Sequence, residues 1–373
     1  MSWIESHRKS EALASGAHVA LRDGRGEAAR QLFAEAAIAE EDALRQLDPI
    51  AQPRTFGITA VSAVALLYKG QKLDYAESLA HRILAHSYIA PFAVSQLRTL
   101  IQAIWNFRAQ ESAGIKFAPG QVQVSVRGGE VVTGGAPLDL IVEKVQTIQA
   151  MFYRTMELLK NLPLRRHGPA SREIQEACRP WLFQGVPASY QFVVAIQRPL
   201  QRDWISPDSV SPEDVAAKFL SIVKNAADDP IEGLSTVVPD QDYRAAFLKL
   251  ARNLSPPTSG KMFNQIEIRG AGDAVPVVLV PESRKAIAQT LKTEAPPGGA
   301  NMEAVVVKGV LRGVHLDRDW LEVTVEGEKS VRVENVGEAL DDVIGPMVNH
   351  PVIVQALKDK KGKLRFRDIE REE

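Results

Sequence analysis

The chain has 373 residues, of which 45% are apolar and 24% charged, as in an ordinary globular protein. This length exceeds what one hydrophobic core usually serves, so we expect two or three domains. The 45 Lys and Arg against 46 Asp and Glu give a net charge of −1, which excludes a global field that attracts nucleic acid or an anionic membrane.

The lone cysteine, Cys178, excludes an intramolecular disulfide and a zinc site built from several thiolates, as expected in a reducing compartment. The first residues lack an apolar signal segment, and no later run approaches the roughly 20 apolar residues that span a bilayer. We therefore expect a cytoplasmic protein that does not act on membranes.

Residues 1–115 form the first predicted domain, because they are rich in Ala, Leu, Glu and Arg and almost free of strand patterns. Four or five helices are expected. The segment 14–37, ASGAHVALRDGRGEAARQLFAEAA, resembles a tetratricopeptide hairpin, with Gly24 in the turn and Ala29, Phe33 and Ala36 where the two helices meet.

A weaker second copy lies at residues 62–84, with Gly70 in the turn and Ala76, Ala80 and Ile83 on the second helix. It follows the first by about 46 residues, which is longer than the ~34 residues of the tetratricopeptide unit. The resemblance implies a tetratricopeptide-like stack, and such stacks usually serve as docking surfaces. The alternative is a helical domain that only packs against its neighbour.

Residues 116–292 form a predicted mixed α+β domain, which opens with a strand. Val122, Val124 and Val126 alternate with polar residues, Gly128 and Gly129 suit a tight turn, and the apolar run resumes at 131–132. This pattern predicts a β-hairpin.

A long amphipathic helix is predicted to follow, with Pro137 at its start. Its polar side is expected to carry Lys144, Gln146, Gln149 and Glu157. Its buried side is expected to carry the apolar residues that recur at three- and four-residue steps, which are Leu138, Ile141, Val145, Ile148, Phe152, Met156 and Leu159.

Further helices are predicted at 171–178, after the caps Ser211 and Asp240, and at 281–291. Strands are predicted at 190–196, 262–268 and 277–280. A linker follows at 293–301, where paired prolines and glycines replace any apolar periodicity.

Residues 302–373 form a predicted small β-barrel. Five strand-like runs lie at 304–310, 311–316, 320–325, 351–356 and 363–369, and a helical segment at 336–344 falls between the third and the fourth. This order is typical of an oligonucleotide/oligosaccharide-binding (OB) barrel. If the first two runs are one bent strand, an SH3-like barrel is the alternative.

Two groups of cations are candidate sites. Arg165 and Arg166 could bind an anion in a bidentate manner, although as a solvated loop they need no ligand. The second group surrounds the turn of the last hairpin and could follow a nucleic-acid backbone, with Lys363, Arg365 and Arg367 on one face; it comprises Lys358, Lys360, Lys361, Lys363, Arg365 and Arg367. Against this, residues 303–373 carry 12 basic and 15 acidic residues and only two aromatic ones.

No phosphate-binding loop, nucleophile elbow or zinc-protease motif occurs, so we predict no catalytic residue, metal or cofactor. The segments 128–149, 186–196 and 305–317 together resemble uncharacterised prokaryotic proteins with a hairpin-helix unit and a C-terminal small β-barrel. The leading hypothesis is a non-enzymatic scaffold that binds another protein, or itself, through its helical domain. The alternatives are a protein that binds single-stranded nucleic acid through the barrel and an unrecognised enzyme.

Overall fold

The computed structural model describes residues 2–112, 121–132, 134–184, 190–197, 210–270, 275–294, 302–327, 329–337 and 340–372. The chain divides into two compact units. The first comprises Met1–Ile115 with Gln184–Ala188, and the second comprises Lys116–Phe183 with Ser189–Glu373. The α+β segment and the barrel segment thus share the second unit.

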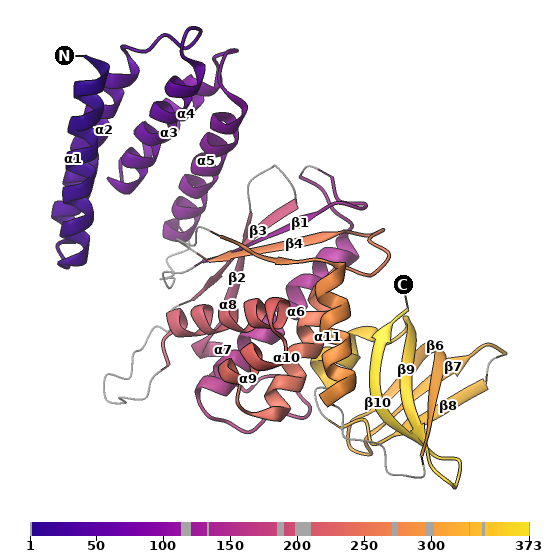
Figure 1. Cartoon of the computed structure of the whole chain (residues 1–373). Coiled ribbons are helices and arrows are strands. Elements are labelled where there is room, and N and C mark those ends of the chain that lie inside the picture. Colours follow the sequence, from indigo (N-terminus) through magenta and orange to yellow (C-terminus); the bar gives the residue numbers. More distant parts are fainter. Residues whose placement is uncertain are drawn as a thin grey trace. The chain divides into compact units, whose positions relative to one another are not determined.

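Helices make up the described part of residues 1–115, as predicted (Figure 1). They are α1 (Trp3–Arg22), α2 (Gly26–Leu44), α3 (Pro53–Lys69), α4 (Leu73–Leu84) and α5 (Pro91–Ser112). Each helix packs against the next one in sequence, and α3 also packs against α5.

Two glycines have a structural role in this unit, one in a turn between helices and one at a close contact between helices. Gly24 has a φ of 75° in the turn between α1 and α2, a conformation that other residues adopt only with strain. Gly70 ends α3, and a Cβ there would lie 2.9 Å from the backbone nitrogen of Ala34 in α2. The predicted turn positions of both glycines are confirmed, and Ala29 and Phe33 lie buried in the core of this unit.

A five-stranded sheet begins the second unit, in the order β2-β3-β1-β4-β5, and β1 pairs antiparallel with β3 and β4, as β4 does with β5. Its strands are β1 (Val122–Arg127), β2 (Pro180–Gln184), β3 (Tyr190–Ile196), β4 (Gln265–Gly270) and β5 (Val277–Leu279). One face of the sheet buries Val122, Val124 and Val126 with Ile266 and Ile268, and the helices of this unit cover it (Figure 1).

The predicted β-hairpin is wrong. Gly128 and Gly129 do form a turn with positive φ, but Val132 then pairs with Gly135 and not with β1. The reason is that both edges of β1 are occupied, by β3 on one side and by β4 on the other. No edge of β1 remains for the segment that follows it.

Six helices are described in the second unit. They are α6 (Leu138–Leu159), α7 (Arg172–Ala177), α8 (Pro212–Asp228), α9 (Glu232–Val237), α10 (Gln241–Leu254) and α11 (Pro281–Glu294). The predicted caps are confirmed: the Ser211 hydroxyl accepts from the Asp214 nitrogen, and the Asp240 carboxylate accepts from the Asp242 and Tyr243 nitrogens. Thr293 continues α11, so the predicted linker begins too early, and residues 295–301 lie outside the described ranges.

Helix α6 is buried on more than the predicted side. Ile148, Phe152 and Met156 are buried as expected, and Phe152 stacks on Phe219 of α8 with ring centroids 4.4 Å apart. Three residues differ from the prediction, since Leu138 is 78% exposed while Lys144 and Glu157 are buried. Both charged side chains have partners inside the unit, and for this reason they can lie away from water.

Residues 303–371 form a closed ring of five hydrogen-bonded strands, in the order β10-β8-β7-β6-β9. The strands are β6 (Glu303–His315), β7 (Trp320–Val325), β8 (Lys329–Glu334), β9 (Pro351–Lys358) and β10 (Leu364–Arg371). Two predicted runs are one long strand, β6, which pairs with β9 through its first half and with β7 through its second. Strand β8 was not predicted.

The predicted helical segment between the third and fourth strands is not an α-helix, and it extends beyond its predicted end at residue 344. It consists of one π-helical stretch, Leu340–Ile344, followed by a 3-10 turn, Gly345–Met347. Val343, Ile344 and Met347 bury their side chains in the core of the second unit.

A pair of adjacent substitutions tests the buried face of α6. Ile148→Asp places a carboxylate where the side chain is 1% exposed, and we expect a loss of about 3 kcal/mol or more in the free energy of unfolding. Gln149→Asp adds the same acid at the neighbouring exposed position and should cost less than about 0.5 kcal/mol. Thermal melts compare the two variants, and a larger loss from Gln149→Asp would contradict this packing.

Candidate functional site

The basic residues of the last hairpin do not form one continuous stripe. Lys358 ends β9, Lys360 and Lys361 lie exposed in the turn, and Asp359 shapes that turn by accepting from the backbone nitrogens of Lys361 and Lys363 at 2.8 and 2.9 Å. The Lys363 ammonium pairs with Glu334 at 3.1 Å. Local acids therefore offset part of the positive charge.

A bulge in β10 interrupts the alternation predicted for Lys363, Arg365 and Arg367. The register shifts between Phe366 and Asp368, so Arg367 lies within the irregularity. Its guanidinium donates to the carbonyl of Lys292 at 3.3 Å, whereas Arg365 is exposed. A straight backbone-following row of three cations is thus not present on this strand.

The outward face of β7 and β8 carries one aromatic ring with charges of both signs. The Arg332 guanidinium lies 4.3 Å from the centre of the Trp320 ring, in cation–π contact. Glu322 is the cross-strand partner of Arg332, and Glu334 is that of Trp320. Two carboxylates beside the ring make this face unfavourable for a phosphate backbone.

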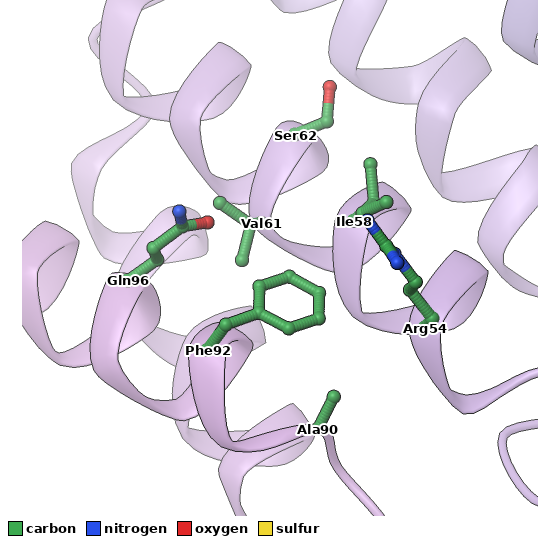
Figure 2. Close-up of a pocket in the computed structure, with 7 residues that line it drawn as sticks. All are labelled: Arg54, Ile58, Val61, Ser62, Ala90, Phe92 and Gln96. Carbon is green, nitrogen blue, oxygen red and sulfur yellow. The ribbon is translucent and has the colours of Figure 1, made fainter. Parts of the chain in front are cut away.

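A groove lies between α3 and α5 in the first unit, with a volume of about 790 Å³ (Figure 2). Ile58 and Phe92 line it and are 49% and 37% exposed. Val61, Ala90 and the polar side chains of Ser62 and Gln96 complete most of the wall. The groove is therefore mainly apolar, with hydrogen-bonding groups at its edge.

Arg54 is the charged residue of this groove, and Figure 2 shows its side chain beside Ile58. It is exposed, and its guanidinium forms no ion pair or hydrogen bond with the residues that the structure describes. An apolar groove bordered by an available guanidinium suits a ligand that combines apolar side chains with a carboxylate.

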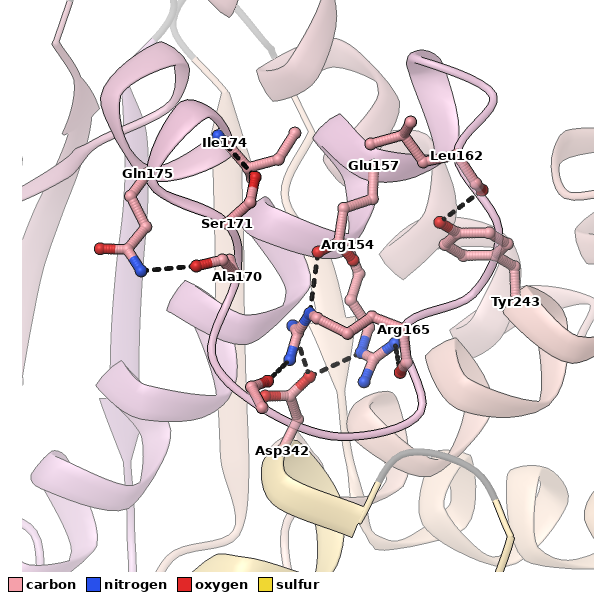
Figure 3. A network of polar contacts seen from close by, with 11 residues as sticks. Arg154, Glu157, Leu162, Arg165, Ala170, Ser171, Ile174, Gln175, Tyr243 and Asp342 are labelled. Atoms are coloured by element: carbon pink, nitrogen blue, oxygen red, sulfur yellow. Dashed lines mark hydrogen bonds and ion pairs between the residues drawn. The ribbon is translucent and has the colours of Figure 1, made fainter. Parts of the chain in front are cut away.

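The two arginines predicted to bind an anion have different environments. The Arg165 guanidinium is partly buried and pairs with Glu157 at 2.9 Å and with Asp342 at 3.2 Å (Figure 3). Burial alone would lower the pKa of Arg165, but the two carboxylates raise it. Arg166 and the following His167 are exposed. Arg165 therefore already has anionic partners within the protein.

Asp342 also accepts from Arg154, an arginine of α6 with no exposed surface. The Arg154 Nε lies 2.7 Å from the Asp342 carboxylate, and its Nη1 donates to the carbonyl of Arg165 (Figure 3). Asp342 belongs to the short helical segment of the barrel, so its ion pairs with Arg154 and Arg165 link the barrel to α6 and to the loop after it.

A second buried ion pair joins α10 to β10. The Arg252 guanidinium contacts both carboxylate oxygens of Asp368, at 2.5 and 3.0 Å, and donates to the carbonyl of Ile369 at 2.7 Å. Burial would raise the pKa of Asp368, but the charge of Arg252 outweighs it and the pKa is lowered. Sequence reasoning missed Arg154 and Arg252, because nothing near either residue in the chain marks its carboxylate partner.

Removing the carboxylate of Asp368 tests this junction. We expect Asp368→Asn to cost roughly 3 kcal/mol of unfolding free energy at pH 7, since it leaves the buried charge of Arg252 without a counterion. The control Glu372→Gln breaks the exposed pair with Lys308 and should cost less than about 1 kcal/mol. Denaturant titrations would contradict the assignment if the two losses were equal.

The lowered pKa of Asp368 also fixes the sign of a pH dependence. The carboxylate stabilises the fold above its unfolded pKa of about 3.8, and this contribution disappears as the pH falls through the lower folded value. Melting curves between neutral pH and pH 3 should show a steeper acid loss for the wild type than for Asp368→Asn. If the stability of the two proteins fell equally with pH, the assigned role of the Asp368 carboxylate would be contradicted.

The described residues hold no cluster of three His, Cys, Asp or Glu side chains suited to a metal ion. None of the described helices is long and apolar enough to cross a membrane. Among the described residues, two hollows are open to a ligand: the α3/α5 groove, with Arg54 at its edge, and the end of the barrel near Lys358. Comparisons with protein-family models, with curated proteins and with solved structures found no match.

Proposed function

We propose that this is a non-enzymatic binding protein whose helical unit holds a segment of another protein in the groove between α3 and α5. The main support is the groove itself, in which Ile58 and Phe92 expose apolar surface next to the guanidinium of Arg54. Its volume of about 790 Å³ lies in the range of ligand pockets. The expected partner segment combines apolar side chains with an acidic residue.

We further propose that the helical unit is a tetratricopeptide-like stack. The sequential packing of α1 to α5 supports this, as do the glycine turns at Gly24 and Gly70. Small residues lie buried at the helix contacts in both predicted copies, among them Ala29 and Ala76. Stacks of this kind commonly present grooves to peptides. Within this proposal the protein is prokaryotic and acts in the cytoplasm.

Affinity capture from a lysate of the native organism, with the captured proteins quantified, tests the groove. Phe92→Glu and Arg54→Glu should each reduce specific capture by about tenfold or more, because one removes apolar contact and the other repels an acidic partner. Ile38→Glu is the matched control, since it adds the same charge to an apolar side chain, 59% exposed, of α2 in the same unit.

Equal capture by the wild type and both groove variants would overturn the proposal. Self-association through the same unit is separated by sedimentation analysis of the purified chain. If a second copy occupies the groove, the wild type forms dimers that Phe92→Glu dissociates and Ile38→Glu does not.

We also propose an OB-like identity for the barrel. The single long strand β6 was the condition set for the SH3-like alternative, but the order in which the strands close the ring favours the OB fold. Counted along the chain, its strands close in the order first-second-third-fifth-fourth, with a helical segment between the third and fourth, as in OB folds. This resemblance favours nucleic-acid binding as the second candidate function. The carboxylates of Glu322 and Glu334 on the β7/β8 face count against it.

The third alternative, an enzyme, has the least support. Arg165 is engaged by Glu157 and Asp342, and so is not available to a substrate in this arrangement. The thiol of Cys178 is fully buried, and burial raises its pKa to about 12, which is unfavourable for a nucleophile at neutral pH.

A further inference from the structure

One end of the barrel contains a hollow of about 830 Å³. The strand register explains its position: β6 begins, β9 ends and β10 begins at the same level, with Lys358 opposite both Glu303 and Leu364. The last pair of β7 and β8, Val325 with Lys329, lies at this end as well. The hollow is thus bounded by the β9/β10 turn and by the first halves of β6 and β8.

The lining of the hollow is strongly biased toward positive charge. Among the described residues that line it, the charged ones are Lys308, Lys329, Arg332, Lys358, Lys363 and the acid Glu334. Lys363 already pairs with Glu334, and Lys308 with Glu372. The ammonium groups of Lys329 and Lys358 form no ion pair or hydrogen bond with any residue that the structure describes, so both can receive an anion.

Aliphatic side chains form the rest of the lining. Val305, Val325, Val331 and Leu364 are only half-buried and pack against the barrel core from this end. No aromatic residue is among the described residues that line the hollow. Base stacking is therefore unsupported at this place, whereas an aliphatic group would gain from covering the valines.

We propose that the hollow binds an aliphatic carboxylate, with the carboxylate held by Lys358 and Lys329 and the hydrocarbon chain against the valine floor. This site is separate from the α3/α5 groove and does not depend on the function proposed for it. It also divides the predicted basic group, because Lys358 and Lys363 line the hollow while Lys360, Lys361, Arg365 and Arg367 do not.

Isothermal titration calorimetry of the full chain with hexanoate, octanoate and decanoate tests the proposal. Affinity should rise by up to about fourfold for each added methylene, as expected when a chain is buried against apolar side chains. Acetate, which lacks the chain, and decanol, which lacks the charge, should each bind at least about tenfold more weakly than decanoate. Affinity that is independent of chain length, or no saturable binding of decanoate, would overturn the proposal.

Charge variants locate the binding. Lys358→Glu should weaken decanoate binding about tenfold or more, the loss of one charge-assisted hydrogen bond. Lys361→Glu makes the same change in the same hairpin outside the hollow and should leave binding unchanged. Equal weakening by both variants would place the anion elsewhere, on the general charge of the turn.

A variant that fills the hollow tests the role of its volume without changing its charged residues. Val331→Phe adds volume to the floor and should also weaken decanoate, while thermal melts confirm that the variant is folded. Fluorescence anisotropy with labelled oligo(dT) gives the competing outcome. Tight, salt-dependent binding of the oligonucleotide that Lys360→Glu and Lys361→Glu abolish, with no binding of decanoate, would replace this proposal with the nucleic-acid alternative.

Discussion

The architecture of the second unit depends on the burial of arginine charge. Arg252 has no exposed surface, and moving its guanidinium out of water is unfavourable unless a counterion accompanies it. That counterion, Asp368, lies 116 residues further along the chain, in the last strand of the barrel. Separating the barrel from α10 would break this ion pair and divide the apolar core that both share. The barrel and the α+β segment are therefore held together by charge pairing and by a common core.

Two further groups of ion pairs also link the barrel to the α+β segment, at other points of their contact. Asp342 of the barrel receives Arg154 and Arg165, and Arg371 at the end of β10 pairs with Glu143 of α6 at 2.5 Å. Among these cations, Arg165 is the one that the sequence presents as available to a ligand, and its contacts within the protein occupy it. The groove beside Arg54 and the barrel end beside Lys358 are described surfaces whose cations stay outside these internal ion pairs.

Periodicity and capping predicted the helices well, because both signals are local. Helices α8 and α10 begin at the serine and aspartate caps expected, and Ile148 and Phe152 lie on the buried side of α6 as their spacing requires. The failures concern partners that are distant in sequence. The strand at Val122–Arg127 was assigned to a hairpin because no local signal indicates that two later strands occupy both its edges.

The candidate sites were harder to predict for a related reason. A charged residue in an amphipathic helix is normally solvated, so Lys144 and Glu157 were assigned to the wrong side of α6. Their burial becomes intelligible only with the partners in place, such as the carbonyl of Asn253 for Lys144 and the guanidinium of Arg165 for Glu157. The α3/α5 groove could not be predicted either, because its lining residues come from two separate segments that meet only in the fold.

The position of Asp368 has a consequence for how the chain is made. A ribosome adds roughly 5 to 20 residues per second, so α10 emerges on the order of ten seconds before its counterion is synthesised. Strand β10 also supplies the parallel pairing with β8 that closes the ring, so the barrel stays open during the same interval. The helical contacts of residues 1–115 are local and can form while translation continues. Until β10 supplies that counterion, Arg252 of α10 must stay in water, so α10 reaches its final buried position only after β10 has been made.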